Sequence, residues 1–138
     1  MIGKLILSHG GLAEELLRTA ERIAGPLQGF RALSLSWDEG SEEAKRRIRH
    51  ELKELDQGEG VLILADMFGD TPCNVAVSML EPHRVELVSG INLPLVVRLA
   101  CPGAPQTLDA LAHWAVTKAQ SSVRLVTGSD AQGEPPCG

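Results

Sequence analysis

Positions 61–65 hold five consecutive apolar residues, Val-Leu-Ile-Leu-Ala, between a glycine-rich turn and Asp66. A strand with one face in water alternates apolar and polar residues, whereas an unbroken apolar run predicts a strand covered on both faces. Strands of that kind belong to parallel sheets, because the crossover connections of a parallel sheet place helices on its faces. Residues 61–65 therefore indicate an α/β domain with a buried central strand.

The rest of the chain alternates short aliphatic runs with amphipathic segments, as such a domain requires. We predict a three-layer sandwich with a mostly parallel central sheet and helices on both faces, with residues 1–128 as one domain and residues 129–138 as a flexible tail. Ser41 and Asn92 are the expected N-caps of two helices. The predicted strands span residues 2–8, 30–36, 61–65, 84–88 and 123–126, and the predicted helices span residues 12–24, 41–55, 72–80, 93–101 and 105–119.

Charge and aromatic content exclude a nucleic-acid partner. The 138 residues include 13 basic and 18 acidic side chains, for a net charge of -5, which gives a phosphate backbone nothing to attract it. Only 3% of the residues are aromatic, too few for a platform that stacks bases. The partners are therefore expected to be proteins or small molecules.

Cysteine use and the N-terminus indicate a cytoplasmic protein. The three cysteines, Cys73, Cys101 and Cys137, form neither a CxxC pair nor an even set, so we expect free thiols. The apolar run at the N-terminus is too short for a secretory signal. No segment approaches the roughly eighteen consecutive apolar residues of a spanning helix, so no membrane insertion is expected.

A histidine and a carboxylate are expected at one edge of the predicted sheet. Open α/β sheets bind ligands beyond the carboxyl ends of their strands. The first strand ends at Ser8 and His9, the third at Asp66, and the fourth leads to Asn92. The other histidines do not reach this edge: His83 precedes its strand, and the remaining two lie within helices. A solvated histidine at a strand end is the alternative interpretation of His9.

Two predicted helix starts flank this pair and favour an anion. Gly10 and Gly11 open the first helix, and Gly69-Asp70-Thr71-Pro72 opens another, and helix N-termini present amides and positive potential. Ordinary capping by Asp70 or Thr71 is the alternative. Together with His9 and Asp66 they indicate a phosphohistidine site, in which a carboxylate holds one imidazole nitrogen while the other attacks phosphorus.

The sequence lacks the residues that nucleotide binding, aspartate phosphorylation or metal-dependent hydrolysis would require. There is no phosphate loop ending in Gly-Lys-Ser/Thr and no GxGxxG after the first strand, so no nucleotide cofactor is expected. A phospho-aspartate receiver domain would need an acidic pair where Ser8, His9 and Gly10 stand. A metal hydrolase would need more than one histidine at the site, so no metal is expected either.

Three motifs carry a resemblance to a known family: Ser8-His9-Gly10, Asp66-Met67-Phe68-Gly69-Asp70-Thr71-Pro72-Cys73-Asn74 and Gly90-Ile91-Asn92-Leu93-Pro94. In this order and spacing they resemble the IIA component of the mannose-type (mannose/fructose/sorbose) bacterial sugar phosphotransferase system, over residues 1 to about 128. The resemblance implies an α/β sandwich, a phosphotransferase activity and a role in sugar uptake, in association with a membrane permease complex.

The resemblance also implies partners and residue roles. His9 would accept a phosphoryl group from the phosphohistidine of the carrier protein HPr, which enzyme I charges from phosphoenolpyruvate, and pass it to a histidine of a IIB domain. Asp66 would hold the other imidazole nitrogen, and Gly10, Gly69, Asp70 and Thr71 would surround the phosphoryl group. Asn92 would support the loop or a partner. Family members form homodimers by exchanging the C-terminal strand, here residues 123–126.

One departure and two alternatives remain. The family reads Gly-Gly before Ser/Thr-Pro, and Asp70 here replaces the second glycine, which adds a carboxylate beside the phosphoryl site. The same phosphorylation can serve as a regulatory signal to a protein partner instead of transport. A phosphotransfer subunit of a dihydroxyacetone kinase system also carries a histidine at a strand end, although Gly90-Ile91-Asn92-Leu93-Pro94 favours the mannose type.

Overall fold

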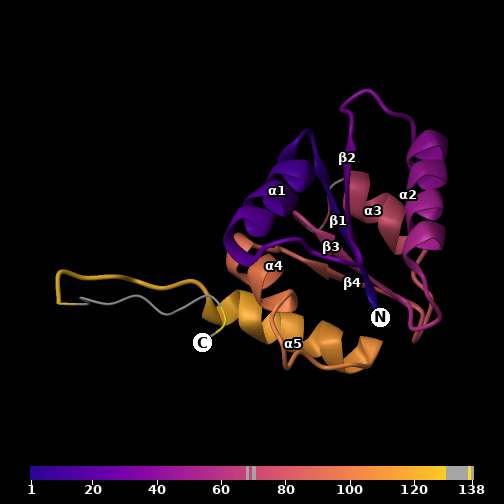
Figure 1. Ribbon diagram of the computed structural model, residues 1–138. Coiled ribbons are helices and arrows are strands. Elements are labelled where there is room, and N and C mark those ends of the chain that lie inside the picture. The colour runs from indigo at the N-terminus through magenta and orange to yellow at the C-terminus, as the bar shows by residue number, and fades with distance from the viewer. Residues whose placement is uncertain (68, 70, 130–136, 138) are drawn as a thin grey trace.

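The computed structural model describes residues 1–67, 69, 71–129 and 137 (Figure 1). A single sheet of four parallel strands forms the centre, in the order β2-β1-β3-β4. The two inner strands, β1 and β3, were the two strongest aliphatic runs in the sequence. The strands are β1 (Gly3–His9), β2 (Phe30–Leu35), β3 (Val61–Ala65) and β4 (Val85–Ser89).

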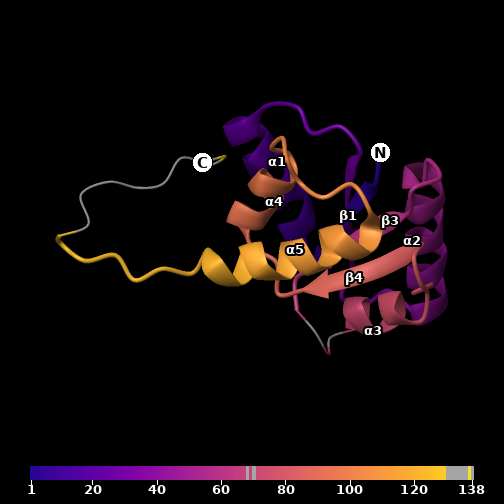
Figure 2. The same ribbon diagram turned by 90° about the horizontal axis from the view of Figure 1, so that it is seen from below.

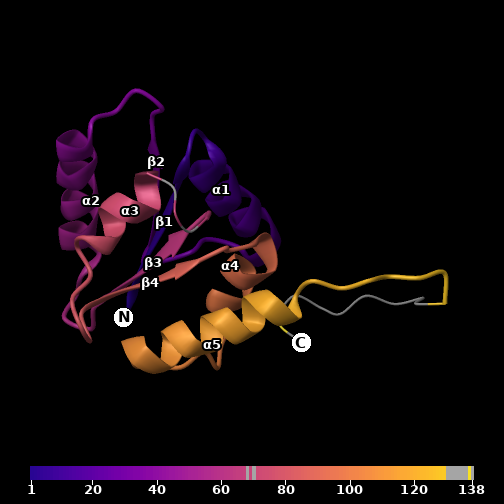
Figure 3. The same cartoon turned by 180° about the vertical axis from the view of Figure 1, so that it is seen from behind.

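Helices cover both faces of this sheet, which confirms the predicted three-layer sandwich (Figures 1 and 3). One face carries α1 (Leu12–Ala24), α4 (Leu93–Leu99) and α5 (Leu108–Ser121). The other carries α2 (Ser41–Leu55) and α3 (Thr71–Val77). In the part of the chain that the structure describes, no helix combines the length and the apolar character needed to cross a membrane.

The core is divided by the sheet into two layers. Along β3, every residue is buried, and alternate side chains face opposite layers, with Leu62 and Leu64 packed beneath α1, α4 and α5 and with Ile63 packed beneath α2 and α3. Full burial of an aliphatic side chain stabilises the fold by about 1.5–3 kcal/mol. The central strands are therefore the most firmly fixed part of the molecule, and their carboxyl ends are the natural place for a precise site.

Several helix ends differ from the prediction by one to three residues: α3 ends at Val77 and not at residue 80, α4 ends at Leu99 and not at residue 101, and α5 spans Leu108–Ser121 and not residues 105–119. Gly40, not Ser41, is the N-cap of α2, because its backbone is extended and Ser41 is already helical; glycine has no side chain, so no side-chain bond caps that end. Pro72 is the second residue of α3 and not the first. Asn92 is confirmed as the cap of α4, since its side-chain oxygen accepts a hydrogen bond from the Leu95 amide at 3.0 Å.

The C-terminal region departs furthest from the prediction. Residues 123–126 form no strand in the single chain: the segment leaves the end of α5 and projects away from the sheet (Figures 1 and 2). Val123, Leu125 and Val126 are 82%, 88% and 70% exposed. The flexible tail predicted for residues 129–138 lies mostly outside the described residues, since only 129 and 137 are described.

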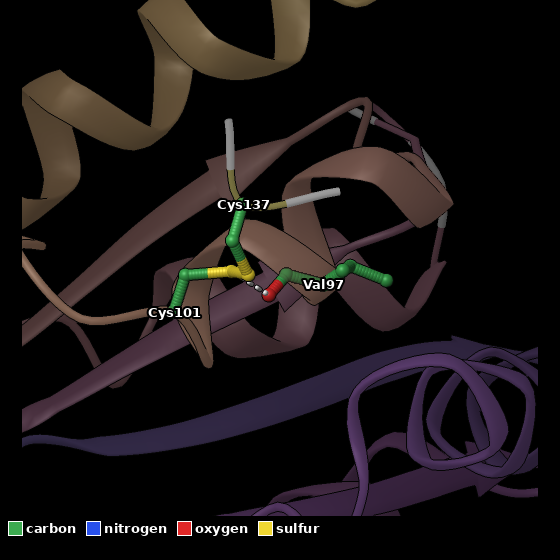
Figure 4. The surroundings of a disulfide bond; sticks show 3 residues. All are labelled: Val97, Cys101 and Cys137. Atoms are coloured by element: carbon green, nitrogen blue, oxygen red, sulfur yellow. Dashed lines mark hydrogen bonds between the residues drawn. A yellow bond between two sulfur atoms is a disulfide. The ribbon is translucent and has the colours of Figure 1, made fainter. Parts of the chain in front are cut away.

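The prediction of three free thiols is wrong for two of them. Cys101, just after α4, forms a disulfide with Cys137, with 5.7 Å between their Cα atoms (Figure 4). Sequence spacing gave no sign of this bond because the two residues are 36 positions apart and share no motif. Cys73 is a buried thiol in α3.

Candidate functional site

The candidate site lies where the sheet reverses its direction of winding. The chain leaves β1 through α1 on one face, and it leaves the neighbouring β3 through α3 on the opposite face. In open α/β sheets, this switch point opens a crevice beyond the carboxyl ends of the strands. His9 is the last residue of β1, and Asp66 directly follows β3, so the topology brings the two predicted residues together.

His9 and Asp66 make two contacts. The Nδ1 atom of His9 lies 3.0 Å from Oδ2 of Asp66, and the backbone N–H of His9 donates to the same oxygen at 3.1 Å. The other carboxylate oxygen, Oδ1, accepts from the Met67 amide at 2.9 Å. With a carboxylate at Nδ1, the proton is assigned to that nitrogen and the lone pair to Nε2.

Both side chains are partly shielded from water, with 21% of the His9 side chain and 12% of the Asp66 side chain exposed. The carboxylate is held by backbone amides at both oxygens, so it orients the imidazole without relying on a mobile partner. A hydrogen bond in such a setting is stronger than one in bulk water. The arrangement fixes the orientation of the ring and can stabilise positive charge that develops on it.

Ser8 ties the site to the first helix, which the sequence did not reveal. Its fully buried hydroxyl accepts from the Ala13 amide at 2.7 Å and donates to the His9 carbonyl at 3.1 Å. Gly11 is the N-cap of α1 but has no side chain to cap it, so Ser8 supplies the missing acceptor from the strand. The end of β1 and the start of α1 are therefore joined through one side chain.

Gly10 lies in the turn that joins β1 to α1. Its φ of +50° lies in the left-handed region, which a glycine adopts without steric cost. Its N–H donates to the carbonyl of Leu35 at the end of β2, at 3.3 Å. That amide is therefore committed to the backbone, and the contribution of Gly10 to the site is the space left by its missing side chain.

Trp37 contacts His9 directly, and sequence reasoning missed it. The two rings stack with 4.8 Å between centroids and an angle of 19° between planes. The sequence did contain an indication that Trp37 is unusual: it is one of only two tryptophans, and it lies in a polar segment just after β2. What the sequence lacked was the register of the sheet, in which Leu35 pairs with His9.

The second predicted helix start is described only in part. Gly69 adopts a φ of +90°, and the Asn74 amide group donates to its carbonyl at 3.4 Å. The backbone of Thr71 begins α3. Asp70 lies outside the described residues, so the phosphoryl-binding roles of Gly69, Asp70 and Thr71 stay predictions.

The remaining predicted residue, Asn92, has a structural role. Besides capping α4, its Nδ2 atom donates to the carbonyl of Ala119 near the end of α5, at 3.0 Å. Its side chain therefore links α4 to α5, two helices of the same layer. This agrees with loop support, and a contact with a partner stays a prediction.

The other three histidines lie elsewhere, as the sequence indicated. His50 is in α2, His113 is in α5, and His83 precedes β4, where its Nδ1 lies 2.7 Å from Oδ2 of Asp109. Among the residues that the structure describes, no group of three or more histidine, cysteine, aspartate or glutamate side chains is arranged to hold a metal ion.

Comparison with known proteins identifies the family. The model of the EIIA-man family, "PTS system fructose IIA component", matches residues 3–116, which include His9, Asp66 and Asn92. A mannose/sorbose-specific IIA subunit from Enterococcus faecalis has the same fold, with a TM-score of 0.81 and 33% identity over 92% of this chain and 96% of that one. The IIA protein of a fucose utilization operon from Streptococcus pneumoniae gives 0.76 and 32%, over 89% and 91%.

Curated relatives agree. The fructose-specific EIIA component of Bacillus subtilis is 30% identical over 72% of this chain and 68% of its own length. The mannose-specific EIIAB component of Escherichia coli is 28% identical over 98% of this chain but only 42% of its own length, so this chain spans less than half of that relative. By sequence over residues 3–116 and by structure across the whole sheet, this chain belongs to the mannose-type IIA family of the phosphotransferase system, a family of phosphotransfer components.

Proposed function

We propose that this chain is a cytoplasmic phosphocarrier in phosphoenolpyruvate-dependent sugar uptake. His9 accepts a phosphoryl group from the phosphohistidine of HPr and passes it to a histidine of a IIB domain. The observation that carries the proposal is the contact of 3.0 Å between His9 Nδ1 and Asp66 at the switch point of the sheet. Because Nδ1 faces the carboxylate, we assign the role of nucleophile to Nε2, in a chain whose family transfers phosphoryl groups.

In the proposed step, the lone pair on Nε2 of His9 attacks the phosphorus atom of the donor's phosphohistidine. The new Nε2–P bond forms as the donor's N–P bond breaks, and the donor nitrogen keeps the electron pair of the broken bond. The proton on Nδ1 stays between His9 and Asp66, so the ring gains positive charge next to a carboxylate. Transfer to the IIB histidine is the same displacement with His9 as the leaving group.

Positioning and charge stabilisation supply most of the catalysis, because the phosphoryl group itself needs little covalent help. We assign the incoming phosphoryl group to the space between the starts of α1 and α3. Gly10 and Gly69 allow its close approach, and, as the sequence predicts, we assign hydrogen-bond donation to the amides of residues 70 and 71 and to the Thr71 hydroxyl. The extra carboxylate of Asp70 is expected to slow transfer compared with a glycine at that position.

A homodimer is part of this proposal. Val123, Leu125 and Val126 are apolar and exposed, their segment forms no strand, and β2 and β4 are the two edge strands of the sheet. Exposed apolar strands pair readily with open edges, so exchange of this segment between two chains would bury both. Analytical ultracentrifugation of the chain and of a version that ends at residue 122 tests this, with a monomeric shorter chain as the expected result.

Reconstitution tests the phosphotransfer. The chain is incubated with phosphoenolpyruvate, enzyme I and HPr, and phosphate is located by mass spectrometry under conditions that preserve phosphohistidine. We expect one phosphoryl group on His9, none in His9→Gln, and normal labelling in the matched control His83→Gln. Addition of a IIB domain should discharge the labelled protein. An unlabelled wild-type chain, or full labelling of His9→Gln, would falsify the proposal.

A further inference from the structure

Trp37 combines exposure with a specific contact. Its side chain is large and apolar, 78% of the residue is accessible to water, and yet its ring lies flat against His9, 4.8 Å between centroids and 19° from parallel. The ring buries little apolar area here, so burial alone does not account for its position. The stack covers one face of the imidazole and leaves the ring edge, where both nitrogens lie, to Asp66 and the phosphoryl group.

The loop that carries Trp37 is anchored at both sides. Before it, Leu35 pairs with His9 in the sheet and accepts a hydrogen bond from Gly10. After it, Glu39 accepts a hydrogen bond from Arg47 of α2 at 2.5 Å, and its own amide donates to the Ser36 carbonyl at 3.2 Å. The backbone that carries the indole is therefore held on both sides, by β1 and by α2.

The indole also lies beside Gly10. A Cβ atom at position 10 would lie 3.9 Å from Nε1 of Trp37, which is ordinary van der Waals contact. A longer side chain at position 10 would have to extend past the indole. The indole is therefore next to the turn that follows His9 as well as to the His9 ring.

We infer that Trp37 is a positioning residue for phosphoryl transfer, which holds the plane of the His9 ring and stabilises the phosphorylated state. The inference rests on the proposed function of His9. With the phosphoryl group on Nε2 and a proton kept on Nδ1, the imidazole ring carries positive charge. A cation over the face of a tryptophan is attracted by the negative potential of the ring, and tryptophan is the best aromatic partner for this. Neutral, unphosphorylated His9 gains less from the same stack.

The first test measures the equilibrium of phosphoryl exchange with HPr, which does not depend on how well the proteins dock. Cation–π attraction at an exposed site corresponds to a shift of about two- to five-fold. We expect Trp37→Leu to move the equilibrium toward phospho-HPr by that factor and Trp37→Phe, which keeps a weaker aromatic face, to restore part of it. Trp114→Leu, which changes the other tryptophan, is the matched control and should leave the equilibrium constant unchanged.

The second test uses fluorescence of folded, full-length protein. In Trp114→Phe, Trp37 is the sole tryptophan, and phosphorylation should change its emission because charge appears on the stacked ring. The double variant Trp114→Phe/His9→Gln should show no change under the same treatment. Circular dichroism of each variant establishes that it is folded.

The outcomes separate the two hypotheses. A wild-type chain that is never phosphorylated overturns the proposed function and this inference with it. A phosphorylated wild type with the same equilibrium constant in Trp37→Leu overturns the inference alone. If Trp37→Leu changes the rate with HPr but not the equilibrium, the inference is also overturned, and Trp37 is then a contact for the partner protein.

Discussion

Two histidine–aspartate pairs lie at opposite edges of the sheet. His9 and Asp66 meet beyond the carboxyl ends of β1 and β3, with 3.0 Å between Nδ1 and Oδ2. His83 and Asp109 meet at the other edge, between the turn before β4 and the first turn of α5, with 2.7 Å between the same kinds of atom. By distance alone, the second pair is the better hydrogen bond.

Their surroundings differ. The side chains of His9 and Asp66 are 21% and 12% exposed, whereas those of His83 and Asp109 are 78% and 46% exposed. Asp66 is fixed by two backbone amides, but Asp109 faces a second carboxyl group, Glu86, whose pKa is raised by a hydrogen bond to Asp109 and by desolvation. A histidine–carboxylate contact is therefore not a site by itself. Shielding, a fixed carboxylate and a place for substrate distinguish the first pair.

The largest effect is expected when the hydrogen bond between His9 and Asp66 is broken and the pair of His83 and Asp109 is left intact. In Asp66→Asn, the amide can no longer enforce the Nδ1–H form of His9 or offset positive charge on the ring. We expect the rate of phosphorylation by HPr to fall by about 10²- to 10⁴-fold. Rapid-quench kinetics measures this rate. Asp109→Asn is the matched control, and a loss of similar size there would remove the distinction between the pairs.

A second prediction compares the helix caps at the two edges. Ser8→Ala deprives the buried Ala13 amide of its acceptor, and we expect the free energy of unfolding to fall by about 1–3 kcal/mol. Thr107 caps α5 from an exposed position with a long hydrogen bond of 3.4 Å to the Ala110 amide, so Thr107→Ala should cost about 0.5–1 kcal/mol. Urea denaturation gives both values. Equal losses would mean that burial of the cap does not matter.

The smallest effect is a pH dependence at the His83 edge. Because the pKa of Glu86 is raised from its usual 4.5, the folded protein retains a proton that the unfolded chain has released. This carboxyl therefore contributes stability at low pH and loses it as pH rises through 4.5 and the raised value. Glu86→Gln can donate to Asp109 at every pH.

We therefore expect the difference in Tm between Glu86→Gln and wild type to grow in favour of the variant between about pH 4 and pH 7. Differential scanning calorimetry across this range measures it, with Glu21→Gln on the exposed face of α1 as the control for loss of one negative charge. His83 and His113, which face the same carboxyl pair, oppose the shift through their positive charge and are kept intact. A difference in Tm that does not vary with pH contradicts the assigned cause.

The sequence was sufficient for the four strands of the sheet and for the central pair, although the strand predicted at residues 123–126 does not form in the single chain. The aliphatic runs at β1 and β3 predict buried parallel strands. The carboxyl ends of neighbouring parallel strands meet at one edge of the sheet, which placed His9 beside Asp66. The same logic placed His83 at the other edge. These inferences need only the direction of each strand.

Features that depend on register or on distant segments were not accessible. Trp37 reaches His9 because Leu35 and His9 are paired, and nothing in the local sequence states that pairing. The sequence predicts that Ser8 is a strand residue and does not indicate that its hydroxyl caps α1. The bond between Cys101 and Cys137 joins segments whose separation carries no pattern. The bounds of α2 were predicted correctly, but its cap was assigned one residue too late because Gly40 and Ser41 are both acceptable caps.

The double role of Ser8 limits how the chain can change in length over evolution. Since one side chain bonds to both β1 and α1, an insertion between Gly10 and Leu12 would pull the helix amide away from the hydroxyl and shift His9 along with it. The connection from β2 to α2 carries Trp37 and is held mainly by Arg47, which contacts Glu39 and donates to the Ser34 carbonyl at 3.4 Å; this long side chain can follow a change in loop length. Related chains should therefore vary in length after β2 and keep a constant number of residues after β1.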